Sequence, residues 1–197
     1  MNYDKLIDQL TIQQLAHALY LKGEKEGYDK VTDKTKWREL VIAENLGHTV
    51  HKKISAGSGS LEEGSDSYDS TRGKYGEYKS KAIIDIEVRN LLRQERNVKT
   101  GKRFAPLTVS GLYNGAYTSG AIDKYTKIDH YFGVFYKELC LLIIKVNTGY
   151  VIETLRNGLL KMTERGSTNC NTVKVNLGDT HLYDVVFKDE EWWNENK

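Results

Sequence analysis

The sequence predicts a single α+β domain, with a central mixed β-sheet flanked by helices, on three observations. Apolar residues recur at helical spacing near both ends of the chain. Short apolar or alternating segments, which are typical of strands, lie between those ends. The 197 residues, of which 39% are hydrophobic and 28% charged, suffice for one domain with a substantial core. We therefore treat residues 1–197 as one unit with three successive parts.

The first part, residues 1–48, is predicted to be helical. Thr11 is a candidate N-cap for a helix with apolar residues at helical spacing, which two glycines end, Gly23 and Gly27. A second helix is expected over residues 36–46, with Gly47 as its C-cap. These helices are candidates for a dimer interface, and packing within the monomer explains their apolar faces equally well.

The second part, residues 49–146, is predicted to hold the central sheet. Residues 55–70 are rich in Gly and Ser and should form a loop. An interdomain linker is the alternative, but the segment runs directly into a strand-like stretch that contains charged residues. The expected elements are strands at 49–54 and 75–84, a helix at 86–97, a strand at 107–113, a helix at 121–125, and strands at 131–136 and 139–146 that join through Lys137 and Glu138.

The third part, residues 147–197, is predicted to contain a helix and a hairpin. Residues 152–165 place Ile152, Leu155 and Leu159 at helical spacing. Residues 172–187 have the pattern of two strands, with turn residues at Gly178 and Asp179.

Membrane and zinc-binding classes are not indicated by the sequence. No apolar run is long enough to cross a bilayer, and the N-terminus lacks the pattern of a signal peptide. We therefore expect a cytoplasmic protein with no membrane partner. Cys140 belongs to an apolar run and Cys170 does not, and a disulfide between them is not expected in the cytosol. No spacing of Cys and His indicates a zinc site.

Charged residues are unevenly distributed, although the formal net charge is only +2. A basic run lies within residues 86–106 and comprises Arg89, Arg93, Arg96, Lys99, Lys102 and Arg103. Acidic residues gather earlier in the chain, at Glu62, Glu63, Asp66 and Asp69. A basic arm beside an acidic pocket suits a polyanionic substrate that is bound next to a cation. A solvated helix face explains the basic run equally well.

Glu77, Tyr78 and Lys79 form an E-x-K triplet on the expected strand. Side chains alternate across a strand, so Glu77 and Lys79 point to the same face. A hairpin would bring Asp66, eleven residues before Glu77, back beside it. Two carboxylates suit Mg²⁺, which polarises a phosphate and lowers the pKa of bound water, while a lysine stabilises charge on phosphorus. The alternative is a salt bridge on a solvated face of the sheet.

These residues resemble the PD-(D/E)xK nuclease motif, and more closely the motif of PvuII-type restriction endonucleases. The matching pieces are Glu63-Gly64-Ser65-Asp66 and Glu77-Tyr78-Lys79-Ser80. Ser65 stands where the motif usually has proline, and the hairpin is one residue longer. Lys124-Tyr125 and the strand at 131–136 resemble the lysine–tyrosine helix end and the next core strand of these enzymes. The likeness covers about residues 63–84 and 124–136, with 86–106 as an insertion.

The resemblance implies a restriction-endonuclease-like fold and a magnesium-dependent active site. Asp66 and Glu77 would be the metal ligands and Lys79 the catalytic lysine. Three further acids are secondary candidates for the metal: Glu63, Asp69 and Glu44. Asp69 lies in the same loop as Asp66 and is its rival. Glu44, on the second helix, is either a supplementary acid or an ordinary exposed glutamate.

Residues 108–119 are polar, small and tyrosine-rich, and the resembling enzymes have the part that enters the DNA groove here. Asn114 is placed to contact adenine with two hydrogen bonds. Further candidate DNA contacts are Ser110, Thr118, Ser119 and Lys124. The phosphate backbone would be held by basic side chains of the insertion: Arg93, Arg96, Lys102 and Arg103. An ordinary surface loop is the alternative for residues 108–119.

We expect a Type II restriction endonuclease of a restriction–modification system, which hydrolyses double-stranded DNA at specific sequences with Mg²⁺. Cutting both strands of a palindrome requires two active sites related by a twofold axis, so a homodimer is implied. One alternative is a structure-specific or DNA-repair nuclease of the same superfamily. The other is a non-catalytic DNA-binding protein in which Asp66, Glu77 and Lys79 form a salt-bridge network.

Overall fold

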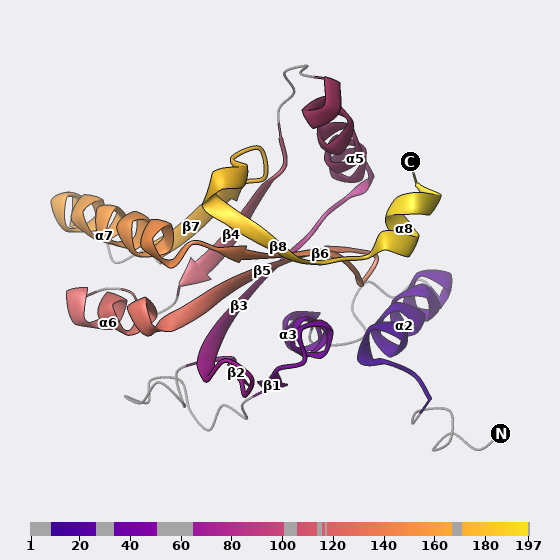
Figure 1. Ribbon diagram of the computed structural model, residues 1–197, viewed down its shortest axis with the longest axis horizontal. Helices are drawn as coiled ribbons and strands as arrows, with labels where there is room; N and C mark the ends of the chain where they lie inside the picture. Colours follow the sequence, from indigo (N-terminus) through magenta and orange to yellow (C-terminus); the bar gives the residue numbers. More distant parts are fainter. Residues whose placement is uncertain are drawn as a thin grey trace.

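The computed structural model describes residues 9–26, 34–50, 65–100, 106–113, 116, 118–166 and 171–196. Its elements confirm the predicted α+β class with a central mixed sheet (Figure 1). In chain order they are α2 (Ile12–Glu26), α3 (Lys34–Leu46), β1 (Thr49–Val50), β2 (Ser67–Asp69), β3 (Lys74–Ala82), α5 (Asp85–Thr100), β4 (Thr108–Tyr113), α6 (Ser119–Lys124), η1 (Tyr125–Lys127), β5 (Ile128–Tyr136), β6 (Leu139–Val146), α7 (Thr148–Arg165), β7 (Asn171–Asn176), η2 (Thr180–Leu182), β8 (Tyr183–Lys188) and α8 (Glu190–Glu195).

The central sheet has the strand order β1-β2-β3-β5-β6-β8. Strands β3 and β5 run parallel, whereas the other neighbours are antiparallel. A parallel pair needs a long crossover, and α5, β4 and α6 all lie within it. Strand β4 pairs with β7 in a second, two-stranded sheet. That small sheet and α7 cover one face of the central sheet, and α2 and α3 cover the other (Figure 1).

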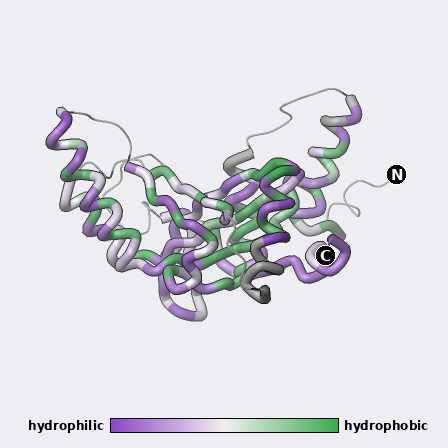
Figure 2. The backbone as a smooth tube through the Cα atoms, turned by 90° about the horizontal axis from the view of Figure 1, so that it is seen from above, coloured by the Kyte–Doolittle hydropathy of each residue, from purple (hydrophilic) through white to green (hydrophobic). Residues whose placement is uncertain are grey.

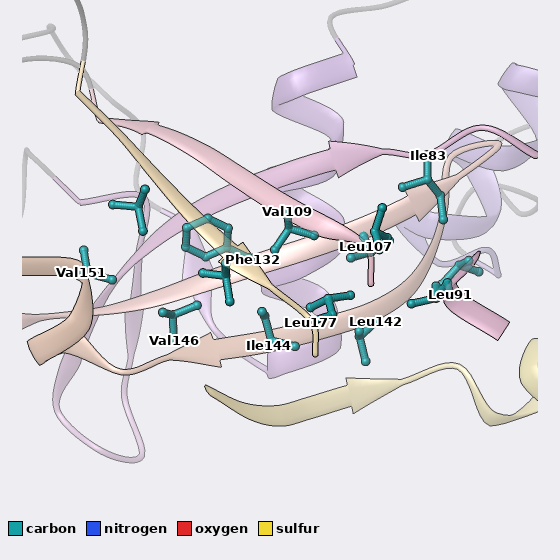
Figure 3. Close-up of a cluster of buried hydrophobic side chains, with 14 of the residues drawn as sticks. Ile83, Leu91, Leu107, Val109, Phe132, Leu142, Ile144, Val146, Val151 and Leu177 are labelled. Atoms are coloured by element: carbon teal, nitrogen blue, oxygen red, sulfur yellow. The ribbon is translucent and has the colours of Figure 1, made fainter. Parts of the chain in front are cut away.

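Two hydrophobic clusters follow from the alternation of side chains along β5. Phe132 and Val134 point into the larger cluster, where they meet residues of β4, such as Val109, and of α7, such as Val151 (Figure 3). Tyr131, one position before Phe132, and Phe135, one position after Val134, point into the smaller cluster under α3. Hydrophobic residues accordingly gather on the central strands, and the outer helices are more mixed (Figure 2).

Local hydrogen bonds explain the bounds of the two N-terminal helices. The hydroxyl of Thr11 accepts from the backbone N–H of Gln14, and the Gln14 side chain accepts from the N–H of Thr11, which is a capping box. Helix α2 continues past Gly23 and ends at Glu26, directly before Gly27, the second of the two glycines predicted to end it. Helix α3 ends at Gly47 as predicted, because a φ of +67° there is in the left-handed region that favours glycine.

Glu44 is engaged at the start of α2. Its carboxylate accepts from the backbone N–H groups of Ile12 at 3.0 Å and Gln13 at 3.4 Å. These groups have no partner within their own helix, so Glu44 satisfies donors that would otherwise lack an acceptor. The side chain therefore supports the contact between α2 and α3, and the structure does not bring it to Asp66 and Glu77.

The predicted C-terminal hairpin at 172–187 is wrong. Both strands exist, and Asp179 does form a turn by donating its N–H to the oxygen of Asn176. However, β7 pairs with β4 and β8 pairs with β6, so the two strands lie in different sheets.

Within the described ranges, no helix is long and apolar enough to cross a membrane.

Candidate active site

The β2–β3 hairpin brings Asp66 beside Glu77. Its turn includes Gly73, whose φ is +64°. The Asp69 carboxylate accepts from the N–H groups of Thr71 at 2.9 Å and Arg72 at 3.1 Å, which closes the turn. The resulting register pairs Ser67 with Gly76. Asp66, which precedes Ser67, therefore lies next to Glu77, which follows Gly76, as the sequence predicted.

The side chain of Asp66 takes the place of a backbone acceptor directly before β2 begins. Its own N–H donates to the oxygen of Gly76 at 2.9 Å, as in a regular ladder. Its Oδ2 atom accepts from the N–H of Tyr78 at 2.6 Å. The carboxylate is thus held against the peptide that joins Glu77 to Tyr78. Asp66 is only 2% exposed.

Glu77 and Lys79 point to the same face of β3 and form an ion pair between Oε1 and Nζ. Their side chains are 8% and 15% exposed, respectively, because β4 lies over this face. The salt bridge of the alternative interpretation is therefore present, but the sheet face that holds it is not solvated. The Asp66 carboxylate, held at the peptide between Glu77 and Tyr78, adds a second carboxylate to this poorly solvated place.

Two neighbouring carboxylates suit a hard cation. Magnesium binds through a few carboxylates and completes its shell with waters, backbone carbonyls or phosphate oxygens. Asp66 and Glu77 supply two such carboxylates. In the part of the chain described, no three or more His, Cys, Asp or Glu side chains lie close enough together to hold a metal by themselves. Water and phosphate oxygens could supply further ligands.

Two tyrosines lie near the carboxylates. Burial raises the pKa of Tyr113 and of Tyr125, and the negative charges of Glu77 and Asp66 raise both further. Both phenols are therefore neutral at any ordinary pH. Tyr113 comes from β4, and Tyr125 directly follows α6, and their rings meet edge to face at 5.0 Å between centroids.

His130 lies on the same face, opposite Glu77 in the parallel pair of β3 and β5. It is fully buried and contacts the hydroxyl of Tyr113 and the backbone oxygen of Tyr125, each at 3.0 Å. Burial lowers its pKa from 6.5 to about 4, and the positive charge of Lys79 adds to that effect. The side chain is neutral at neutral pH, so it adds no charge to the site.

The depressed pKa of His130 predicts a loss of stability on acidification. The unfolded chain takes up a proton below pH 6.5, while the folded protein does not until about pH 4. Across that window the free energy of unfolding should fall by about 3 kcal/mol because of this residue. Urea unfolding should therefore show that the free energy of unfolding of the wild type, relative to that of His130→Gln, falls as the pH is lowered.

The exposed His181 provides the control for this measurement. His181→Gln should follow the pH dependence of the wild type. Parallel curves for wild type and His130→Gln would contradict the low pKa.

Asp69 points to the opposite face of the sheet, because it is three residues from Asp66 on an extended strand. There it faces His48, with 3.7 Å between Oδ2 and Nε2. His48 also hydrogen-bonds the hydroxyl of Tyr78 at 2.8 Å. Nearby, Asp129 pairs with Arg72 at 3.0 Å and Lys145 at 2.8 Å. The rival of Asp66 therefore belongs to a separate cluster under α3.

The candidate DNA contacts are only partly described. Ser110 is exposed on β4, and Thr118 caps α6 by accepting from the N–H of Ala121 at 3.1 Å. Ser119 and Lys124 are exposed at the two ends of α6. Arg93 is exposed on α5. Glu63, Asn114, Lys102, Arg103 and the side chain of Arg96 lie outside the described residues.

Gly111, Tyr113 and His130 are site residues that the sequence analysis did not identify. A Cβ atom on Gly111 would overlap the side chain of Lys79, so β4 lies directly against that side chain. The alternating burial of β4 shows that Tyr113 points inward. That alternation is visible in the sequence, but the partner that it faces is not.

Comparison with known proteins adds no assignment. No model of a protein family matches the chain, and no curated protein matches its sequence at a significant level.

Proposed function

We propose that the protein is a magnesium-dependent DNA endonuclease with Asp66, Glu77 and Lys79 as its active site. One observation carries the proposal: two buried carboxylates and one lysine share a face of the sheet at the β2–β3 hairpin. The same residues bear the resemblance to the PD-(D/E)xK motif. A parallel β3–β5 pair joined by a long crossover is compatible with an α/β nuclease core, although a fold by itself does not establish an activity.

The residues suit phosphodiester hydrolysis. Magnesium held by Asp66 and Glu77 would polarise the scissile phosphate and lower the pKa of an attacking water. The hydrogen bond from the N–H of Tyr78 keeps the Asp66 carboxylate in place. The ammonium of Lys79, held beside Glu77, would stabilise the negative charge that develops on the phosphate.

The proposal extends to a Type II restriction endonuclease in the cytoplasm that binds double-stranded DNA as a homodimer. Ser110, Thr118, Ser119 and Lys124 are exposed on β4 and α6, the elements next to the candidate active site. This placement supports contacts from these side chains to bases or phosphates. Two copies would supply one active site for each strand.

The test is to incubate the purified protein with a long defined duplex, with Mg²⁺ or with chelator, and to separate the products on a gel. We expect discrete fragments with Mg²⁺ only, and sequencing of their ends would give the recognition site. A smear, or cutting of branched DNA alone, would favour the structure-specific nuclease. Absence of cleavage with any divalent metal, together with unchanged DNA binding by Glu77→Ala, would favour the non-catalytic binding protein.

A further inference from the structure

The ammonium of Lys79 lies against a buried aromatic pair. Its Nζ atom is 4.8 Å from the centre of the Tyr113 ring, close enough for a cation–π contact. The Tyr113 hydroxyl in turn contacts Nδ1 of His130 at 3.0 Å, and both side chains are fully buried. Gly111, two residues before Tyr113, lies against the aliphatic stem of Lys79. Strand β4 thus contacts both the stem and the ammonium of this lysine.

The partners of His130 fix its tautomer. Its Nε2 atom is 3.0 Å from the backbone oxygen of Tyr125, which can only accept, so Nε2 carries the proton. Nδ1 is then an acceptor, and the Tyr113 hydroxyl donates to it. The hydroxyl proton of Tyr113 is therefore engaged in the hydrogen bond to His130, and Lys79 contacts the aromatic ring of Tyr113.

This arrangement can hold the Lys79 side chain without competing with Glu77 for its ammonium. Tyr113 and His130 are both neutral, so neither repels the ammonium nor replaces Glu77 as its anionic partner. Their hydrogen bonds fix the ring orientation from the backbone of Tyr125, at the start of η1. A rigid group behind a catalytic side chain preserves the geometry that the reaction needs.

We propose that Tyr113, held by His130, is a positioning residue that fixes the ammonium of Lys79 in the active site. This inference rests on the proposed nuclease function for its catalytic consequence. The contact chain also joins Lys79 to η1, which follows the helix α6 that we propose to contact DNA.

Four variants separate the contribution of the Tyr113 ring from that of the His130 hydrogen bonds that hold it, which we call the tether. Tyr113→Leu removes the ring, and Tyr113→Phe keeps the ring but removes the hydroxyl. His130→Leu removes the tether, whereas His130→Gln restores it, because an amide can donate to the Tyr125 oxygen and accept from Tyr113. Tyr150→Leu is the control, since Tyr150 also donates its hydroxyl in a hydrogen bond, here to the backbone oxygen of Lys174, but lies away from Lys79.

The first readout is cleavage at saturating Mg²⁺. Because small misplacements of a catalytic group cost up to about a hundredfold in rate, we expect kcat to fall about a hundredfold in Tyr113→Leu and about tenfold in Tyr113→Phe and His130→Leu. KM should stay near the wild-type value, and His130→Gln and Tyr150→Leu should keep a near-normal kcat. If removal of any hydrogen-bonded tyrosine simply unfolded the protein, the fraction of active protein would fall in Tyr150→Leu as well.

The second readout does not depend on activity. Protons of the Lys79 side chain lie close to the Tyr113 ring, so ring currents should shift their NMR signals upfield in the wild type. The shift should vanish in Tyr113→Leu, weaken in His130→Leu and return in His130→Gln. Unshifted Lys79 signals in the folded wild type, or a normal kcat in Tyr113→Leu, would overturn the positioning role. The expected NMR shifts in a wild type that cleaves no DNA would overturn the nuclease function and leave the contact itself established.

Discussion

Lys79→Ala is expected to abolish DNA cleavage while DNA binding stays nearly unchanged. The ammonium is ion-paired with Glu77, next to the carboxylate of Asp66, so in the proposed mechanism it is the group that stabilises charge on the phosphate. Loss of one such group typically slows catalysis by about a hundredfold to a thousandfold. Single-turnover cleavage of a labelled duplex gives the rate, and a binding titration in Ca²⁺ gives the affinity.

Lys81→Ala is the matched control for that experiment. Lys81 lies on the same face of β3, but it pairs with Glu87 on α5 and donates to the oxygen of Thr108. Its removal should leave the cleavage rate within about threefold of the wild type, because surface ion pairs contribute little. Near-normal cleavage by Lys79→Ala would remove this lysine from the mechanism.

Asp66→Asn and Asp69→Asn should differ sharply in activity, although both carboxylates are buried and only three residues apart. Asparagine can still accept from the N–H of Tyr78 at position 66, so the hairpin should persist. It lacks the negative charge that a magnesium ligand needs, and we expect cleavage to fall at least about a hundredfold. Magnesium affinity, followed by calorimetry in the presence of DNA, should fall in the same variant.

Asp69→Asn should cleave at nearly the wild-type rate. Its amide oxygen can still accept from the N–H groups of Thr71 and Arg72, and its side chain faces His48 on the other side of the sheet. A modest loss of stability, about 1 kcal/mol, is expected from the weaker turn. The reverse pattern, an inactive Asp69→Asn and an active Asp66→Asn, would move the metal site to the cluster under α3.

Local patterns in the sequence were sufficient to predict much of the geometry of the candidate site. The alternation of side chains placed Glu77 and Lys79 on one face of a strand, and the short distance in sequence from Asp66 to Glu77 predicted their approach through a hairpin. Gly47 was correctly predicted to end a helix, since glycine adopts the positive φ found there without steric cost.

Pairings between distant segments were not predictable in the same way. The pattern at 172–187 correctly indicated two strands, but β7 joins β4, which lies about sixty residues earlier in the chain. A period of two specifies which side chains are buried and says nothing about which strand is the neighbour. The contact of Lys79 with Tyr113 escaped prediction for the same reason, because Tyr113 reaches the site through the packing of β4 on β3.

The most direct test of the account is the magnesium dependence of plasmid cleavage, measured side by side for wild type and Glu77→Gln. Glutamine keeps the size of the side chain and removes the charge that Mg²⁺ requires. The account predicts saturable, chelator-sensitive cleavage by the wild type and a rate at least about a hundredfold lower for Glu77→Gln, with equal DNA affinity in Ca²⁺. Equal rates for the two proteins, or no cleavage by a folded wild type that binds DNA, would contradict it.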